Sequence, residues 1–210
     1  MDDEISAVLI ALNQFAQYYS DEEVLQWSLI RGPLPVVGSH YEEHLELTHN
    51  LSGFTDFLGA MSSLNFTSGN GTSLEMLMDA VYLSIGNISG ALPIPISDLQ
   101  WKGIVNPTGF GNIVKESNPP IDQFIINWRP GVDKIIIVIT DEKEQSYLHP
   151  SITNQHLIDA LVATPQLKLH TFTRFSFWQW DEIAAATGGE NFKLSSNPTE
   201  IYNSLMQILD

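Results

Sequence analysis

The chain contains no cysteine and has few basic residues. Its 210 residues include 9 Lys and Arg against 25 Asp and Glu, so the formal net charge is -16. The missing cysteines exclude disulfide bonds and thiolate metal sites. The excess of negative charge opposes a phosphate backbone, which makes nucleic acid a poor candidate for a partner. An acidic surface suits cations or basic partner surfaces, although it more often only maintains solubility.

Long apolar runs are also missing. No uninterrupted apolar stretch reaches the roughly 18 residues of a membrane-spanning helix. The first residues, Met1-Asp2-Asp3-Glu4, are acidic, whereas a secretory signal peptide begins with basic residues. We therefore expect neither a membrane span nor a signal sequence in this chain. Its length and its hydrophobic content of 43% suit one globular domain with a buried core.

The spacing of apolar residues predicts an alternation of helices and strands. Helices are predicted over 3–20, 54–61, 74–85, 153–163, 178–187 and from 198 onward. Strands are predicted over 24–30, within 44–49, and over 135–140, 167–173 and 191–194. The order predicts an α/β fold with a doubly wound, mostly parallel sheet and helices on both faces.

Proline and glycine set the expected breaks in this pattern. The first strand is expected to stop at Gly32-Pro33. Residues 88–128 are rich in both residue types and are expected to form an irregular insertion. Trp101, Phe110 and Trp128 are expected to hold this insertion against the body of the domain.

The most informative stretch is residues 134–140, followed by Asp141 and Glu142. Residues 135–140 are six consecutive β-branched side chains, which predicts a strand buried on both faces. In an open parallel sheet, ligands bind outside the carboxyl ends of the strands. Asp141 is therefore the first candidate for a functional residue. The alternative is that Asp141 and Glu142 only open a solvated loop.

Three segments, in this order, resemble the von Willebrand factor A (vWA) domain family. Gly69-Asn70-Gly71-Thr72 opens a helix that runs through Glu75, Asp79 and Ala80. Trp128-Arg129-Pro130-Gly131 precedes the strand that ends in Thr140-Asp141-Glu142. The chain then closes with 183–189, 191–194 and a last helix. The resemblance implies a Rossmann-like fold and a function in adhesion or protein binding, not catalysis.

The resemblance also implies a metal-ion-dependent adhesion site. In the family, this site uses an Asp-x-Ser-x-Ser loop, a Thr from a second loop and an Asp from a third. Thr72 and Asp141 match the second and third loops, with Ser73 and Glu142 as neighbours without an assigned role. Such a site holds Mg²⁺, or Mn²⁺ or Ca²⁺, and leaves one position for a carboxylate of a protein partner. On its own, Thr72 also suits an ordinary helix N-cap.

The family resemblance implies a setting in a larger extracellular or cell-surface protein. An intracellular assembly factor that acts beside an ATPase is the alternative within the family. A metal-independent vWA scaffold that binds partners through surface loops, above all residues 88–128, is the alternative mechanism.

The chain departs from the family at its beginning. It contains no Asp-x-Ser-x-Ser motif and no first strand, and its first six residues look like those that follow such a motif. We therefore expect residues 1–210 to be a single vWA-like domain truncated at the N-terminus. It would lack its first strand and three of five metal-ligand positions, so metal binding is expected to be weak or absent.

One further motif points to another class of function. His40-Tyr41-Glu42-Glu43-His44 fits the H-x-x-E-H pattern of inverted zinc metallopeptidases. That chemistry needs both histidines on one face of a helix and a third ligand. Here the motif lies between two predicted strands, so we interpret it as a chance match.

The truncation hypothesis makes a prediction about the gene. The nucleotide sequence directly upstream of the Met1 codon should encode, in frame, an apolar strand followed by Asp-x-Ser-x-Ser. Sequencing of the genomic locus and of the transcript tests this. An upstream region with an in-frame stop codon and no such motif would contradict the hypothesis.

Overall fold

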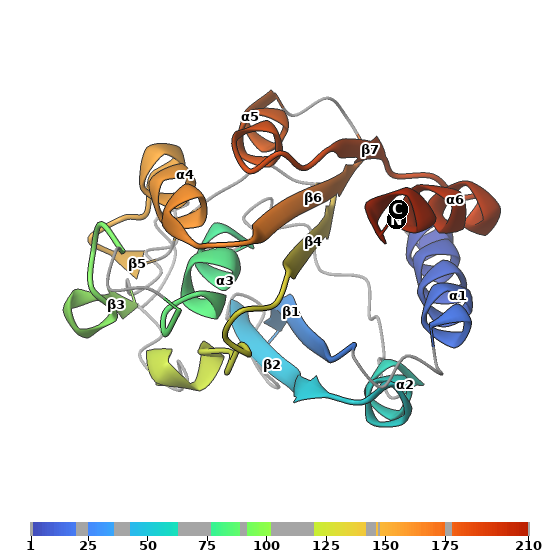
Figure 1. The fold of residues 1–210 in the computed structure, drawn as a ribbon, viewed down its shortest axis with the longest axis horizontal. Helices are drawn as coiled ribbons and strands as arrows, with labels where there is room; N and C mark the ends of the chain where they lie inside the picture. Colours follow the sequence, from blue (N-terminus) through green and yellow to red (C-terminus); the bar gives the residue numbers. More distant parts are fainter. Residues whose placement is uncertain are drawn as a thin grey trace, which may run out of the picture.

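The computed structural model describes residues 2–19, 25–35, 43–62, 77–88, 92–101, 120–141, 146, 148–174 and 178–209. Helices and strands alternate along this part of the chain (Figure 1). None of the described helices combines the length and the apolar character needed to cross a membrane. The elements are α1 (Asp2–Tyr18), β1 (Trp27–Pro35), β2 (Glu43–Ser52), α2 (Phe54–Ser62), α3 (Leu77–Ser84), η1 (Ile96–Asp98), β3 (Gln100–Trp101), η2 (Ile121–Phe124), β4 (Lys134–Thr140), β5 (Leu148–His149), α4 (Asn154–Ala163), β6 (Leu167–Thr173), α5 (Trp178–Ala186), β7 (Asn191–Lys193) and α6 (Pro198–Leu209).

The described strands form three small sheets. β4, β6 and β7 form a parallel sheet in the order β4-β6-β7. β1 and β2 form an antiparallel hairpin, and β3 pairs with β5 in a second antiparallel pair. The predicted α/β class and the parallel sheet are confirmed. A single continuous doubly wound sheet is not formed by hydrogen bonds among the described residues.

The pairing of β4 with β6 is the longest regular contact in the parallel sheet. Seven consecutive residue pairs run from Lys134 opposite Leu167 to Thr140 opposite Thr173, without a shift in register. The ladder begins where the Lys134 N–H donates to the Gln166 carbonyl oxygen at 2.7 Å. Thr173 is in turn opposite Lys193 of β7. The carboxyl ends of the three strands are therefore level with one another.

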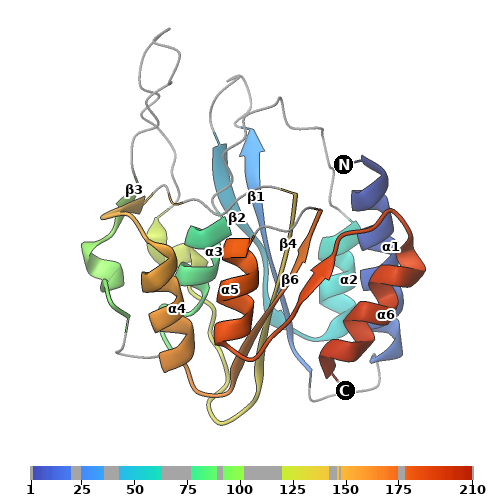
Figure 2. The same cartoon turned by 90° about the horizontal axis from the view of Figure 1, so that it is seen from above.

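Helices cover both faces of this sheet, as the sequence pattern predicted (Figure 2). One face packs on α1 and α6 through Ile135, Ile137, Ile139 and Phe172. The other face packs on α3, α4 and α5, where Val138, Leu167 and Leu169 join a larger apolar cluster. Both faces are apolar because each is removed from water by its own helical layer.

The burial of β4 differs from the prediction. Val138 and Thr140 are buried, but Ile135, Ile136, Ile137 and Ile139 are only partly buried. The strand was expected to be buried on both faces throughout. It is instead the outermost strand of the parallel sheet, so its side chains have a neighbouring strand on one side alone among the described residues.

The described parts of the expected insertion are fastened to α3. The Tyr82 hydroxyl donates to the Ile94 carbonyl oxygen and accepts from the Ile94 N–H, both at 2.9 Å. The Trp128 indole N–H donates to the Ser84 carbonyl oxygen at 2.8 Å. Trp101 meets Phe124 edge to face with ring centroids 6.0 Å apart and packs against the core cluster that includes α3. The anchoring roles predicted for Trp101 and Trp128 are confirmed, and Phe110 lies outside the described residues.

The described parts of residues 88–128 contain regular secondary structure, whereas an irregular insertion was predicted. It contains η1, β3 and η2, and β3 aligns with β5 through Gln100 opposite His149. Burial raises the pKa of the Tyr82 hydroxyl, which keeps it neutral and able to donate to Ile94.

β1 continues past the position where it was predicted to end. Gly32 and Pro33 lie inside the strand, and the register with β2 shifts between Arg31 and Leu34. Proline has no N–H to donate to a ladder, so a strand accommodates it at a bulge or an edge. The prediction that the strand ends at Gly32-Pro33 was wrong. The shift in register accommodates these two residues within the strand, which continues to Pro35.

The turn after α5 depends on two glycines, as predicted. Gly188 has a φ of 73°, a conformation that side chains other than that of glycine rarely adopt. Gly188 and Gly189 donate backbone hydrogen bonds to Ala185 and Ala184, both at 3.0 Å, and so end the helix. A Cβ atom on Gly189 would lie 1.9 Å from the Leu169 carbonyl oxygen of β6. This turn therefore lies against the sheet backbone itself.

Gly189→Ala should lower the free energy of unfolding by about 1–3 kcal/mol. The added methyl group would overlap the Leu169 backbone, and the overlap can be relieved only if the turn or β6 moves. Gly59→Ala is the matched control: a Cβ there meets nothing within 4 Å, and Gly59 lies inside α2. The control should raise stability by about 0.5–1 kcal/mol. Urea unfolding followed by circular dichroism measures both. Equal effects of the two variants would contradict the close approach at Gly189.

Candidate functional site

The candidate site lies at the carboxyl edge of the parallel sheet. Asp141 directly follows β4 and is partly buried, and Arg174 directly follows β6 and is exposed. Because Thr140 and Thr173 are register partners, Asp141 and Arg174 leave the sheet side by side. A carboxylate and a guanidinium therefore emerge from adjacent strands at the edge where open α/β sheets bind ligands.

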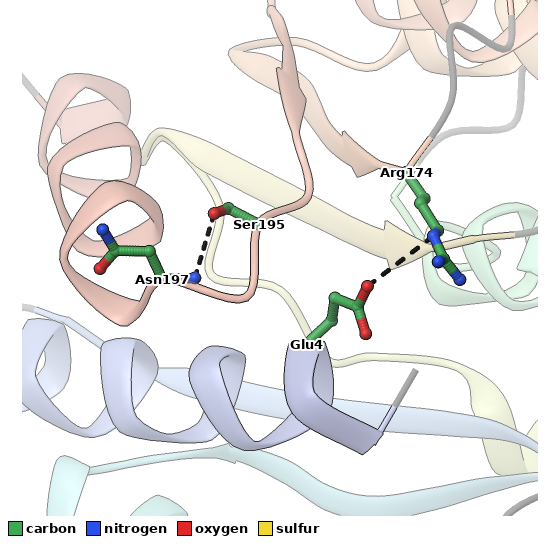
Figure 3. A network of polar contacts seen from close by, with 4 residues as sticks. All are labelled: Glu4, Arg174, Ser195 and Asn197. Atoms are coloured by element: carbon green, nitrogen blue, oxygen red, sulfur yellow. Dashed lines mark hydrogen bonds and ion pairs between the residues drawn. The ribbon is translucent and has the colours of Figure 1, made fainter.

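The first turn of α1 also reaches this edge. The Arg174 guanidinium lies 3.7 Å from a carboxylate oxygen of Glu4 (Figure 3), with the side chains 45% and 16% exposed. An ion pair this exposed adds little to stability, because water screens it. The ion pair matters for the position of α1, because it joins the N-terminal turn of this helix to the end of β6. The acidic side chain is also favourable at the positive end of the helix dipole.

The connection from β7 to α6 forms a third side of the edge. The Ser195 hydroxyl accepts a hydrogen bond from the Asn197 N–H at 3.0 Å (Figure 3). It also donates to Glu200 at 2.6 Å. The Asn197 side-chain oxygen accepts from the Thr199 N–H at 3.0 Å. These bonds satisfy donors in the first turn of α6 and hold the turn in one conformation.

A polar network among β6, β7 and α5 lies next to the carboxyl edge of the sheet. The hydroxyls of Thr171 and Thr173 both donate to the side-chain oxygen of Asn191, at 2.7 and 3.1 Å. The Asn191 amide nitrogen in turn donates to Asp181 of α5. The network ties β6, β7 and α5 together, since each buried polar group has a partner that a shifted strand would lose.

Only one of the predicted metal ligands can be placed. Asp141 lies at the expected edge, whereas Thr72, Ser73 and Glu142 lie outside the described residues. Within the described ranges, no group of three or more His, Cys, Asp or Glu side chains is arranged to hold a metal ion. The structure thus places Asp141 and leaves its pairing with Thr72 a prediction.

The zinc motif falls partly within the described residues. His40 lies outside them, and Glu43 and His44 open strand β2. The peptidase motif requires a helix, and Glu43 and His44 lie in a strand instead.

The structure adds charged residues that were not predicted as part of a site. The pairing of Glu4 with Arg174 joins segments far apart in sequence, and no local pattern signals it. Asp79 is fully buried in the first turn of α3. The sequence signal for this buried carboxyl group was its position between Met78 and Ala80, within an apolar stripe.

His170 is a buried titratable residue in the middle of β6. It is 5% exposed, stacks on Phe192, and its Nδ1 atom accepts a hydrogen bond from the Glu190 N–H at 3.2 Å. The imidazole is therefore neutral, with its proton on Nε2. Burial lowers the pKa of His170, and the nearby Lys168 lowers it further, against a smaller opposing effect of Glu190.

Comparison of this chain with protein-family models, with curated proteins and with solved structures finds no match.

The lowered pKa of His170 predicts a pH dependence of stability. The unfolded chain takes up a proton near the ordinary pKa of about 6.5, while the folded chain does not until a lower pH. The stabilising contribution is thus present above about pH 6.5 and is lost as the pH falls toward the folded pKa. In His170→Asn, which keeps an acceptor for the Glu190 N–H, urea unfolding should show a smaller loss of stability between about pH 7.5 and 5.5.

His149→Asn is the matched control, because His149 is exposed. It should retain the pH dependence of the unmodified chain. If His170→Asn and His149→Asn lose the same stability over this range, His170 does not carry the effect.

Proposed function

We propose that this chain is a protein-binding domain of the vWA type, whose contact surface is the carboxyl edge of the β4-β6-β7 sheet around Asp141. The observation that carries the proposal is the position of Asp141. It follows the buried Thr140 at the end of β4, level with the ends of β6 and β7. A side chain held there by a regular strand is presented in a defined direction to an approaching partner.

The arrangement of the elements supports the vWA interpretation and a Rossmann-like organisation. Helices lie on both faces of the parallel strands, and the β1–β2 hairpin lies on the side of β4 away from β6 (Figure 1). The family setting is an extracellular or cell-surface protein, and this localisation is part of the proposal.

In the metal-dependent form of the proposal, Asp141 supplies a carboxylate oxygen to Mg²⁺, Mn²⁺ or Ca²⁺. Among the described residues no group of three or more His, Cys, Asp or Glu side chains includes it, and such ions take six or more oxygens. Thr72, Ser73 and Glu142 are the residues proposed to add to it. A bound ion would supply positive charge toward an acidic residue of the partner. The role of Asp141 is to fix that charge at the end of β4.

Arg174 favours a second, metal-independent form. Its guanidinium is 45% exposed at the same edge and is oriented by Glu4. A guanidinium binds a carboxylate through parallel hydrogen bonds without a metal ion. In this form, chelation leaves partner binding unchanged and Arg174→Gln abolishes it. In the metal-dependent form, chelation abolishes binding and Arg174→Gln has the smaller effect.

Mn²⁺ titration tests the metal-dependent form. The ion should broaden the amide resonances of Thr140, Asp141 and Arg174 before those at the other end of β4. Asp141→Asn should weaken this binding by about tenfold or more, because it removes the charged ligand. Asp133→Asn is the matched control, since Asp133 is exposed just before β4 begins and should not matter.

Broadening that persists in Asp141→Asn, or that is equally strong around Asp133, would contradict a metal site at Asp141. If partner binding in addition withstands both Asp141→Asn and Arg174→Gln, the carboxyl edge is not the contact surface.

A further inference from the structure

We propose that the outer edge of β4 binds one extended apolar segment of a partner polypeptide, which joins the sheet as an additional strand. This binding surface is distinct from the carboxyl edge around Asp141 and does not depend on the function proposed there.

The first argument is the direction of the backbone groups of β4. Lys134 donates its N–H to Gln166 beside β6, so the even-numbered residues of β4 point their N–H and C=O groups toward β6. The groups of Ile135, Ile137 and Ile139 therefore point the opposite way. Among the described residues no strand pairs with that side of β4. Such a row of donors and acceptors is a template for another strand.

The second argument is that this edge lacks the features that usually prevent strand addition. Edge strands are commonly short, bulged, or interrupted by proline or charge. β7, the other outer strand of the sheet, has three residues and ends in Lys193. β1 contains Gly32-Pro33 and shifts in register. β4 has seven residues, no shift, and no charge or proline between 135 and 139.

The charge at the beginning of β4 does not protect the edge either. The Lys134 ammonium group donates to the carbonyl oxygens of Val132 and Pro165, at 2.9 and 3.3 Å. Lys134 is buried, so its charge is held in the turn before the strand and does not extend along it.

The third argument concerns the chemistry of the occupant. Four isoleucines of β4 are partly buried, whereas residues 169–173 of the neighbouring β6 are all buried. The helical layers that cover β4 contact both of its faces. A strand added in the same plane would have both faces covered as well. It must therefore be apolar on both faces, as a continuous run of β-branched residues is.

The β1–β2 hairpin restricts the occupant to a single strand. The hairpin lies on the side of β4 away from β6 (Figure 1). Its Ile30 and Leu47 pack on one core cluster and its Trp27 on the other. The described residues show no ladder between the hairpin and β4, so it is attached there by side-chain packing. An extended segment can displace such packing, whereas a second folded copy would meet the hairpin before it reached β4.

The probe is a fluorescent synthetic peptide with the sequence of residues 133–141, which is apolar on both faces and carries charge at its ends. We expect it to bind in an anisotropy titration. The same peptide with Pro at both the Ile136 and Ile137 positions should not bind, because adjacent residues point their N–H groups to opposite sides of a strand, so that one of the two missing N–H groups faces β4. In the protein, Ile137→Lys should abolish binding, while Val162→Lys, at an exposed apolar position of α4, should not.

Amide hydrogen exchange of the unmodified chain gives a readout that does not depend on a variant folding. Without peptide, the amides of Ile136 and Val138 should be protected and those of Ile135, Ile137 and Ile139 should not. The peptide should slow exchange of these three amides by at least about tenfold. The proposal is overturned if neither peptide binds, if both bind equally, or if the three amides are already protected in the free chain. Protection that is lost on dilution would identify a second copy as the occupant and would also overturn it.

Discussion

The structure depends on the parallel ladder between β4 and β6. Its seven pairs in unbroken register give the two helical layers a common surface, since α1 and α6 pack on one face and α3, α4 and α5 on the other. The same register sets the ends of the strands level, so that Asp141 and Arg174 leave the sheet together. A shift of one residue would move every side chain of β4 to the opposite face. Core packing and the geometry of the candidate site therefore depend on one constraint.

The two functional surfaces proposed for this chain follow from different parts of that ladder. The carboxyl edge uses side chains, which are directed by the ends of the strands, by the Glu4–Arg174 ion pair and by the Ser195–Asn197 turn. The outer edge of β4 uses backbone groups, whose direction alternates along the strand. The network of Thr171, Thr173 and Asn191 stabilises both surfaces. It joins β6 to β7 and α5, and β6 is the strand with which β4 pairs.

The candidate site was only partly predictable. Asp141 was found because a run of β-branched residues that ends in an acid is a local pattern, and ligand sites lie at the carboxyl ends of parallel strands. Arg174 and Glu4 were missed, since their pairing joins the end of β6 to the start of the chain. His170 gave no signal of its own. Its pKa is lowered by burial first and by Lys168 second. The burial depends on tertiary structure, since only the pairing of β6 with β7 brings Phe192 beside the imidazole.

The sequence by itself determined the α/β class and the type and order of the longer helices and strands, because hydrophobic periodicity and the Gly188-Gly189 stop signal are local properties. The short elements η1, β3, η2 and β5 were not predicted. The tertiary structure alone decided how the strands pair. The β-branched residues of β4 indicated a strand with apolar surroundings, but not that one of its edges has no partner among the described residues. It also decided that β1 passes through Gly32-Pro33, because the bulge forms only opposite β2. Strand pairing joins residues that are distant in sequence. The stability of a pair therefore depends on both strands and cannot be predicted from one segment alone.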